Sequence, residues 1–182
     1  MLSSIKYFIK LKNQKELILK KIIFIRPGKH IKNGSLTGEG VRNIVDLSQK
    51  LKDSVLNQDS RKSILSSPTA NAHETSNLLC RELKINSDYV KIHDVLGVKI
   101  PKNSKDYNIQ ISAIVEREVE KKNDILMIVT NKSVIKSFPR FYAISNLWGD
   151  CSCPHVRHGE AFILHFDKAL TEIYHQPLNI FV

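Results

Sequence analysis

The chain has 182 residues, of which 28 are Lys or Arg and 18 are Asp or Glu, so its formal net charge is +10. Apolar residues make up 42%, and there are only three cysteines. This length and composition fit one globular domain and exclude a collagen-like fibre, a disulfide-rich scaffold and an intrinsically disordered chain. A basic excess of this size is typical of proteins that bind nucleic acid, an anionic membrane or a phosphorylated ligand.

The cysteines indicate the compartment. Cys80, Cys151 and Cys153 are odd in number and lack the spacing of a disulfide framework, which favours reduced thiols and a cytoplasmic location. Lysines interrupt the apolar residues at the N-terminus, so no secretory signal is predicted. No stretch approaches the ~20 apolar residues of a membrane span. We therefore expect a soluble protein.

Residues 1–21 form a basic segment with six lysines and one acidic residue, Glu16, and they carry half of the net charge. Apolar residues at helical spacing predict a short amphipathic helix there. Such a helix can lie on an anionic membrane surface, but this one lacks a Trp anchor and a broad apolar face, so we favour a solvated extension. We place the domain itself at residues 22–182.

Strands and helices alternate along this domain. Short β-branched runs predict strands at residues 21–25, 62–67, 90–92, 124–130 and 161–166. Apolar residues at helical spacing predict helices at 37–56, 68–83, 107–122 and 133–144, the last disturbed by Pro139. Thr37 and Ser67 are the expected N-caps of the first two helices. This alternation predicts a three-layer α/β/α sandwich with a mostly parallel central sheet.

Ligands of such sheets bind beyond the carboxyl ends of the strands. Arg26 follows the first predicted strand, residues 66–71 lie at the end of the second, and residues 130–132 follow the strongest apolar strand. We therefore expect these three segments to converge at one edge of the sheet.

Five segments, in this order, resemble the histidine phosphatase superfamily, whose fold is also called phosphoglycerate mutase-like. FIRPGKH (24–30) is similar to the family's strand followed by Arg-His-Gly, and SLTGEG (35–40) to the Leu-Thr-x-x-Gly that opens the next helix. ILSSPTANAHET (64–75) resembles Ser-Ser-Pro-x-x-Arg-Ala-x-x-Thr, and MIVTN (127–131) the strand that ends in the second His. GEAFILHFD (159–167) is similar to the closing strand.

The resemblance implies phosphoryl transfer through a phosphohistidine, with an attacking imidazole, guanidinium groups that neutralise charge and an acid that protonates the leaving oxygen. Arg26 matches the first Arg, but the nucleophile position is Pro27, the second Arg position is Asn71 and the second His position is Asn131. Asp94 is the nearest candidate for the acid. Pro27 has no lone pair to offer, so the leading interpretation is a catalytically silent or severely impaired pseudophosphatase.

A phosphate-bearing small molecule could still bind at these strand ends. Helix N-termini and basic or hydroxyl side chains hold anions, and no cofactor is expected. The candidate anion-binding residues are Arg26, Gly28, Lys29, Ser66, Ser67, Asn71, Asn131 and Lys132.

Two other functions stay open at this stage. One is an active phosphomonoesterase with rearranged chemistry through His158 or His30. The other is a basic protein that binds an anionic partner or nucleic acid. Against nucleic acid, the chain lacks a recognition motif, and its lysines are dispersed through all the predicted helices.

Histidines outside the matched positions are interpreted as structural. VRHGE (156–160) reproduces the family's signature letter for letter, but it precedes a strand, whereas a nucleophile loop must leave the carboxyl end of one. We therefore interpret it as a turn into the last strand. His30 and His73 are interpreted as a loop and a helix-surface histidine, because neither sits at a strand end that would fix it for attack.

The same region holds a cluster of candidate zinc ligands, Cys151, Cys153, His155 and His158. These are side-chain types that zinc prefers. Four ligands from eight residues would strain a tetrahedral site, so no metal site is expected.

Overall fold

The computed structural model describes residues 19–54, 56, 59–98, 105–147, 155–166 and 173–177. Six strands form one sheet in the order β3-β2-β4-β1-β5-β6. The strands are β1 (Lys21–Ile25), β2 (Lys62–Ser66), β3 (Val90–Ile92), β4 (Ile125–Val129), β5 (Ala161–Phe166) and β6 (Ile173–Pro177). The pairs among β1 to β4 are parallel, whereas β5 runs antiparallel to β1 and β6 antiparallel to β5. The predicted mostly parallel sheet is confirmed.

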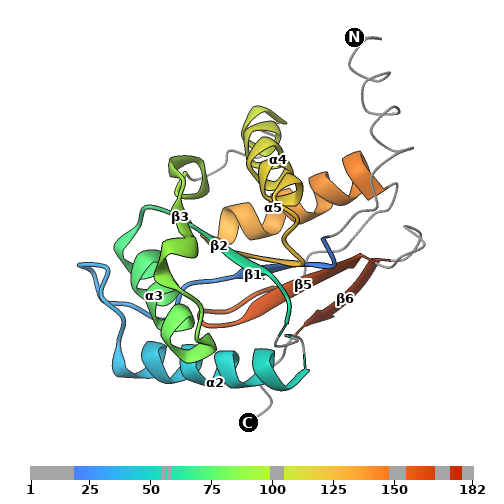
Figure 1. Cartoon of the computed structure of the whole chain (residues 1–182). Coiled ribbons are helices and arrows are strands. Elements are labelled where there is room, and N and C mark those ends of the chain that lie inside the picture. Colours follow the sequence, from blue (N-terminus) through green and yellow to red (C-terminus); the bar gives the residue numbers. More distant parts are fainter. Residues whose placement is uncertain are drawn as a thin grey trace, which may run out of the picture.

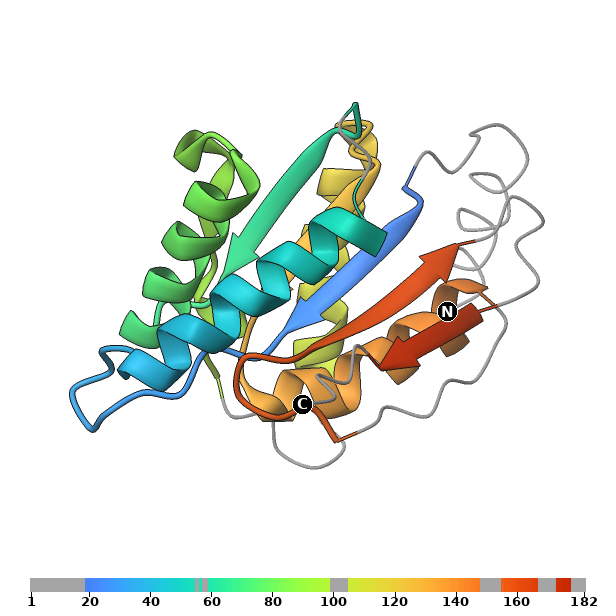
Figure 2. The same ribbon diagram turned by 90° about the horizontal axis from the view of Figure 1, so that it is seen from below.

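Helices cover both faces of this sheet. On one face lie α2 (Gly38–Ser54) and α3 (Ala70–Leu83), and on the other α4 (Lys105–Glu120) and α5 (Lys132–Tyr142) (Figure 1). Seen from below, α2 lies in front of the sheet and α5 lies behind it (Figure 2). Short turns η1 (Ser87–Tyr89), η2 (Asp94–Leu96) and η3 (Ala143–Leu147) complete the elements. The chain is the predicted three-layer sandwich.

The alternating side chains of β1 explain the two layers. Ile22 and Phe24 belong to the core under α4 and α5, whereas Ile23 and Ile25 belong to the core under α2 and α3. All four are fully buried. A short run that is apolar on both faces is what a central parallel strand requires.

Aromatic packing holds β1, the strand that ends just before Arg26. Phe24 contacts Phe138 of α5 edge to face, with ring centroids 6.0 Å apart, and Phe162 of β5 at 6.3 Å. Such pairs add to the stabilisation that comes from burial alone. The carboxyl end of β1 is therefore held between a helix and a neighbouring strand.

Of the two predicted helix N-caps, one is confirmed and one is wrong. Thr37 caps α2 as predicted, since its Oγ1 accepts the Gly40 N–H at 3.0 Å. The prediction that Ser67 caps the next helix is wrong, because α3 begins at Ala70 after Thr69. The Ser67 N–H donates instead to Val129 O at 2.9 Å, which extends the sheet. Pro139 lies inside α5, which continues to Tyr142 before a wider turn begins.

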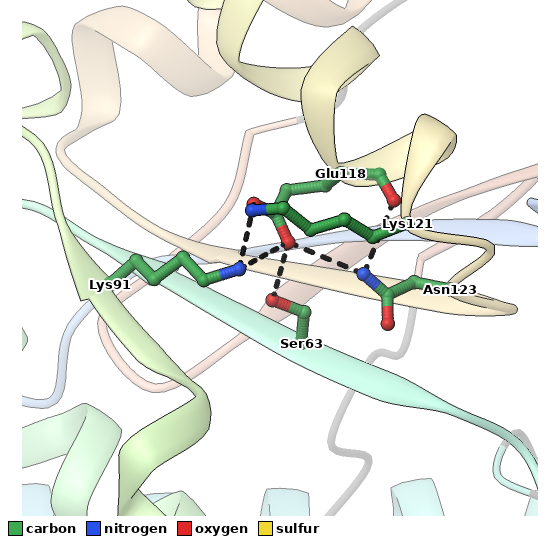
Figure 3. A network of polar contacts seen from close by, with 5 residues as sticks. All are labelled: Ser63, Lys91, Glu118, Lys121 and Asn123. Carbon is green, nitrogen blue, oxygen red and sulfur yellow. Dashed lines mark hydrogen bonds and ion pairs between the residues drawn. The ribbon is translucent and has the colours of Figure 1, made fainter.

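A buried carboxylate ties α4 to the sheet near the amino end of β2 (Figure 3). The Glu118 side chain is 3% exposed and accepts hydrogen bonds from Lys91 (2.7 Å), Lys121 (2.8 Å), Ser63 (3.0 Å) and Asn123 (3.3 Å). Burial by itself would raise the pKa of Glu118, but the bonds from Lys121, Lys91 and Ser63 outweigh it and lower the pKa. The group is therefore an anion paired with two lysines.

Of the basic extension predicted at 1–21, only residues 19–21 are described. Leu19 is buried in the core under α4 and α5, and Lys21 already belongs to β1. Throughout the described residues, no helix has the length and apolar character needed to cross a membrane.

Candidate functional site

The carboxyl ends of β1, β2 and β4 lie side by side, as expected from the sequence. The Thr130 N–H donates to Ile25 O at 3.0 Å, which joins the end of β4 to the end of β1. The bond from Ser67 to Val129 joins the end of β2 to β4. Arg26 therefore emerges at the edge where the segments after β2 and β4 also begin.

The antiparallel strand β5 brings a further segment to this edge. Ala161, its first residue, pairs with Ile25, so the residues before β5 lie beside those after β1. The Arg26 N–H donates to Glu160 O, and the Gly159 N–H donates to Arg26 O, both at 3.0 Å. The predicted turn is confirmed, with Gly159 at φ +77°. The sequence argument that set this turn apart from the site is wrong. Because β5 runs antiparallel to β1, it starts at the edge of the sheet where β1 ends.

Arg26 contacts this turn through its guanidinium. Nη1 donates to Val156 O at 3.0 Å, and Nη2 lies 2.8 Å from His158 Nε2. His158 Nδ1 lies 3.0 Å from Pro27 O. A carbonyl oxygen only accepts, so Nδ1 carries the proton and the lone pair of Nε2 accepts from Arg26. The carbonyl oxygen of Pro27 thus orients a histidine from another segment.

The electrostatic surroundings keep this imidazole neutral. Burial lowers the pKa of His158 most, and the bond to Pro27 O opposes this. Electrostatic interactions with Arg26, His30 and Lys132 lower the pKa further, so the net shift is downward. A neutral ring with a fixed proton on one nitrogen presents a lone pair on the other.

Two more side chains complete what we call the Arg26–His158 cluster, which consists of Arg26, His30, Asn71 and His158. The His30 ring meets the His158 ring edge to face, with centroids 5.3 Å apart. His30 Nδ1 lies 3.1 Å from Asn71 Nδ2 and 3.2 Å from Gly28 O. His30 is an exposed loop residue, as predicted, yet it lies at the cluster, whereas His73 is exposed on α3.

Two predicted anion-binding groups on the loop after β1 have protein partners. The Gly28 N–H donates to Thr75 Oγ1 at 3.2 Å. Lys29 Nζ forms an exposed ion pair with Glu39 at 2.6 Å. These contacts hold the loop against α2 and α3. Among the described residues Arg26 forms no ion pair with a carboxylate. Burial lowers the pKa of Arg26, and the nearby Glu160 carboxylate partly offsets this shift.

The serine pair after β2 is similarly engaged. Ser66 is buried, and its Oγ donates to Ser67 O at 3.1 Å. Ser67 Oγ lies 2.8 Å from Thr69 Oγ1. These hydroxyls bond to their own segment rather than to Arg26.

Asn131, which the resemblance predicts at the second His position, caps α5. Its Oδ1 accepts from the N–H groups of Ser133 (2.9 Å) and Val134 (3.2 Å). Its Nδ2 donates to Val98 O at 3.0 Å and Leu96 O at 3.4 Å. The amide thus joins the helix start to the segment after η2, a role that its place before a predicted helix could have indicated.

The remaining candidates lie at the periphery. Lys132 Nζ lies 3.0 Å from His155 Nε2, and both are outside the direct contacts of Arg26. Asp94 is exposed in η2 and forms no ion pair among the described residues. Cys151 and Cys153 of the candidate zinc cluster lie outside the described residues. Within the described ranges, no three His, Cys, Asp or Glu side chains come together as a metal site.

The layer order and the match to solved structures define the fold: the chain has a phosphoglycerate mutase-like fold, which it shares with several phosphatases of known structure. It is similar to the protein histidine phosphatase SixA solved with tungstate (13% identity, TM-score 0.64, 86% of this chain and 96% of that one). It is also similar to a putative phosphohistidine phosphatase SixA from Nakamurella (16%, 0.60, 88% and 97%). A third match is a mycobacterial glucosyl-3-phosphoglycerate phosphatase solved with VO3 (11%, 0.56, 88% and 98%). No family model and no curated protein matches the sequence.

Proposed function

We propose that this protein binds a phosphate monoester at the Arg26–His158 cluster and is silent or severely impaired as a phosphatase. The observation that carries the proposal is the Arg26 guanidinium, which stands at the carboxyl end of β1 beside Pro27. Among the described residues its hydrogen-bond partners, Val156 O and His158 Nε2, are neutral, and the nearby Glu160 carboxylate opposes the lowering of its pKa by burial without forming an ion pair. A guanidinium beside neutral acceptors binds an oxyanion without first breaking an ion pair. Two structures of similar fold were solved with the oxyanions tungstate and VO3, which supports an oxyanion site here.

Impaired turnover follows from what surrounds Arg26. Pro27 cannot attack phosphorus, and Asn71 offers an amide where a second guanidinium would neutralise developing charge. The Asn131 amide is committed to capping α5. Binding therefore depends on Arg26 and on His158 beside it, whose ring contacts that of His30, while the neutral amides contribute no net charge.

The first test is oxyanion binding by an Arg26→Ala variant. We expect tungstate to bind the parent protein and the variant to bind it at least about tenfold more weakly, because a charge-assisted hydrogen bond contributes about 1.5–3 kcal/mol. Isothermal titration calorimetry measures the dissociation constants. Lys52→Ala, which removes an exposed cation from the last turn of α2, should bind like the parent. Equal weakening in both variants would mean that only general positive charge attracts the anion.

A second test measures how sulfate binding depends on pH. Sulfate is a suitable probe because it keeps its two charges between pH 6 and 8. The free protein holds the pKa of His158 below its ordinary value, and a bound dianion favours the imidazolium, so binding takes up a proton. Affinity should therefore rise as pH falls, by up to tenfold per pH unit for each proton. The slope should flatten in His158→Gln; an unchanged slope would exclude His158 as the coupled group.

We also propose a cytoplasmic location and a domain that spans 22–182 with residues 1–21 as its basic extension. The buried free thiol of Cys80 supports a reducing compartment. Burial of Leu19 and the start of β1 at Lys21 support the boundary to within a few residues. The proposed partner is a phosphate-bearing small molecule.

A further inference from the structure

We propose that the edge of the sheet where β1, β2 and β4 begin is a docking surface for membranes that contain anionic phospholipids. This surface lies at the opposite end of the strands from Arg26, and the inference goes beyond the proposed function. We call it the basic edge. It consists of three pairs of consecutive cations: Lys20 and Lys21, Arg61 and Lys62, and Lys121 and Lys122.

The backbone brings two of these pairs together. Lys21 and Lys62 are the first residues of β1 and β2, and both pair in register with the first residue of β4. The Lys20 N–H donates to Asp124 O at 2.8 Å, and the Asp124 N–H donates to Arg61 O at 2.9 Å. The two pairs therefore lie on either side of the start of β4, at the edge where β1 and β2 begin (Figure 2).

The third pair lies in the turn between α4 and β4. Lys122 has φ +61°, and its N–H donates to Val119 O at 2.9 Å, so the chain turns back toward the sheet there. Lys121 Nζ donates to Glu118 at 2.8 Å, and the same carboxylate accepts from Ser63, the second residue of β2, at 3.0 Å (Figure 3). All three pairs are therefore at one edge of the sheet.

Cations outnumber carboxylates at the basic edge. Asp124 is shared between Lys20 at 3.1 Å and Arg61 at 4.0 Å, whose side chains remain 63% and 57% exposed. Exposed Asp59 and Glu120 lie next to the cation pairs in the sequence, and the cations remain in excess with both included. An excess of exposed cations on one surface attracts an extended anionic partner.

The sequence that leads into this edge favours a lipid partner over nucleic acid. Residues 1–18 directly precede the buried Leu19 and contain four lysines and one acidic residue, with apolar residues among them. An anionic membrane attracts both lysines and apolar side chains, whereas nucleic acid attracts mainly the charge. The segment lacks a Trp anchor, so we expect it to contribute mainly charge to a surface that the folded edge provides.

A protein held by the basic edge presents its phosphate site to the water. Lys21 is the first residue of β1 and Arg26 follows its last, which places them about 16 Å apart at about 3.3 Å per residue. The two surfaces can therefore be occupied at the same time.

Sedimentation of the full chain with large unilamellar vesicles tests the proposal. At about 0.1 M NaCl, the parent should bind vesicles of phosphatidylcholine that contain about a quarter phosphatidylserine, and should not bind vesicles of phosphatidylcholine alone. Binding should be lost at about 0.5 M NaCl, because salt screens exposed charges.

The edge variant combines Lys20→Gln, Arg61→Gln and Lys122→Asn. It should bind the anionic vesicles at least about tenfold more weakly than the parent, because each cation near such a surface adds to the affinity. The variant is expected to fold, since Asp124 still accepts the backbone N–H of residue 61 at 3.0 Å and Asn tolerates the positive φ of residue 122.

The matched control combines Lys32→Gln, Arg42→Gln and Lys105→Asn. It removes the same number of exposed lysines and arginines, from segments that follow the carboxyl ends of β1 and β3. The control should bind the anionic vesicles like the parent. Equal weakening in the two variants would overturn the assignment to the basic edge.

Two other results would overturn the proposal. One is a folded parent that does not bind the anionic vesicles. The other is binding to duplex DNA that depends on the basic edge, without binding to vesicles, which would make nucleic acid the partner. If circular dichroism shows that the edge variant does not fold, Lys122→Asn should still bind vesicles more weakly than Lys105→Asn, and equal binding would contradict the proposal. Tungstate binding at Arg26 is measured separately, so the proposed function stands or falls independently of these results.

Discussion

The Gly40→Ala variant is expected to unfold about 3 kcal/mol more easily than the parent, because its methyl group has no space. A Cβ at this position would stand 2.1 Å from Lys29 O and 2.8 Å from Lys29 N. These are backbone atoms, which cannot swing aside as the end of a flexible side chain can. Lys29 O also accepts the Thr37 N–H at 2.8 Å, so moving it breaks the attachment of the loop to α2.

Gly38 provides the matched control. It is the first residue of the same helix, and a Cβ added there would have space. Its nearest neighbour to an added Cβ is Arg42 Nη1 at 3.9 Å. Gly38→Ala should leave the free energy of unfolding unchanged or raise it by up to about 1 kcal/mol, because alanine favours the helix. Urea denaturation of both variants measures the difference. Similar stabilities for the two would show that the loop does not pack closely on α2.

The Glu118→Ala variant is expected to lose about 2–4 kcal/mol of folding free energy. The carboxylate is buried and accepts charged hydrogen bonds from Lys91 and Lys121, and removing one partner of such a network leaves the others uncompensated. Both lysines are partly exposed, so they regain water and the loss stays below that of a fully buried pair. Thermal and urea unfolding measure the loss.

Glu120→Ala removes an exposed carboxylate two residues further along the same helix and should change stability by less than about 0.5 kcal/mol. The pH dependence provides a second check. Folding lowers the pKa of Glu118, so its stabilisation is present above the ordinary value of 4.5 and is lost as pH falls through the lower folded value. Glu118→Gln should therefore lose less stability than the parent between neutral and acid pH. An equal loss would mean that other carboxylates control acid unfolding.

The layers of the fold could be predicted because each element has a strong local pattern. The run of residues 125–129 is apolar on both faces, as a central parallel strand requires, and the observed strand is fully buried. The start of α3 was mispredicted because the Ser67 N–H continues the sheet rather than the helix. The short edge strand β6 was not predicted at all.

The candidate site could be predicted only in part. Arg26 and the convergence of three strand ends follow from parallel strands, whose carboxyl ends share an edge. The direction of β5 is not encoded in its own residues, because an apolar run fits either direction. The sequence therefore favours a turn for His158 and keeps a catalytic role only as an alternative, whereas the residue lies beside Arg26. Asn131 was assigned to the site by its position after β4, whereas its amide is committed to capping a helix.

The most direct test of the phosphate-binding proposal is a crystal structure of the full chain soaked with tungstate. We predict a tungstate ion within hydrogen-bond distance of Arg26 Nη2 and His158 Nε2, with the Arg26–His158 contact of 2.8 Å opened by the ion. An anomalous difference map locates the metal without ambiguity. At a tungstate concentration that saturates binding in solution, a map with no peak beside Arg26, or with its peak at another surface, would contradict the proposal.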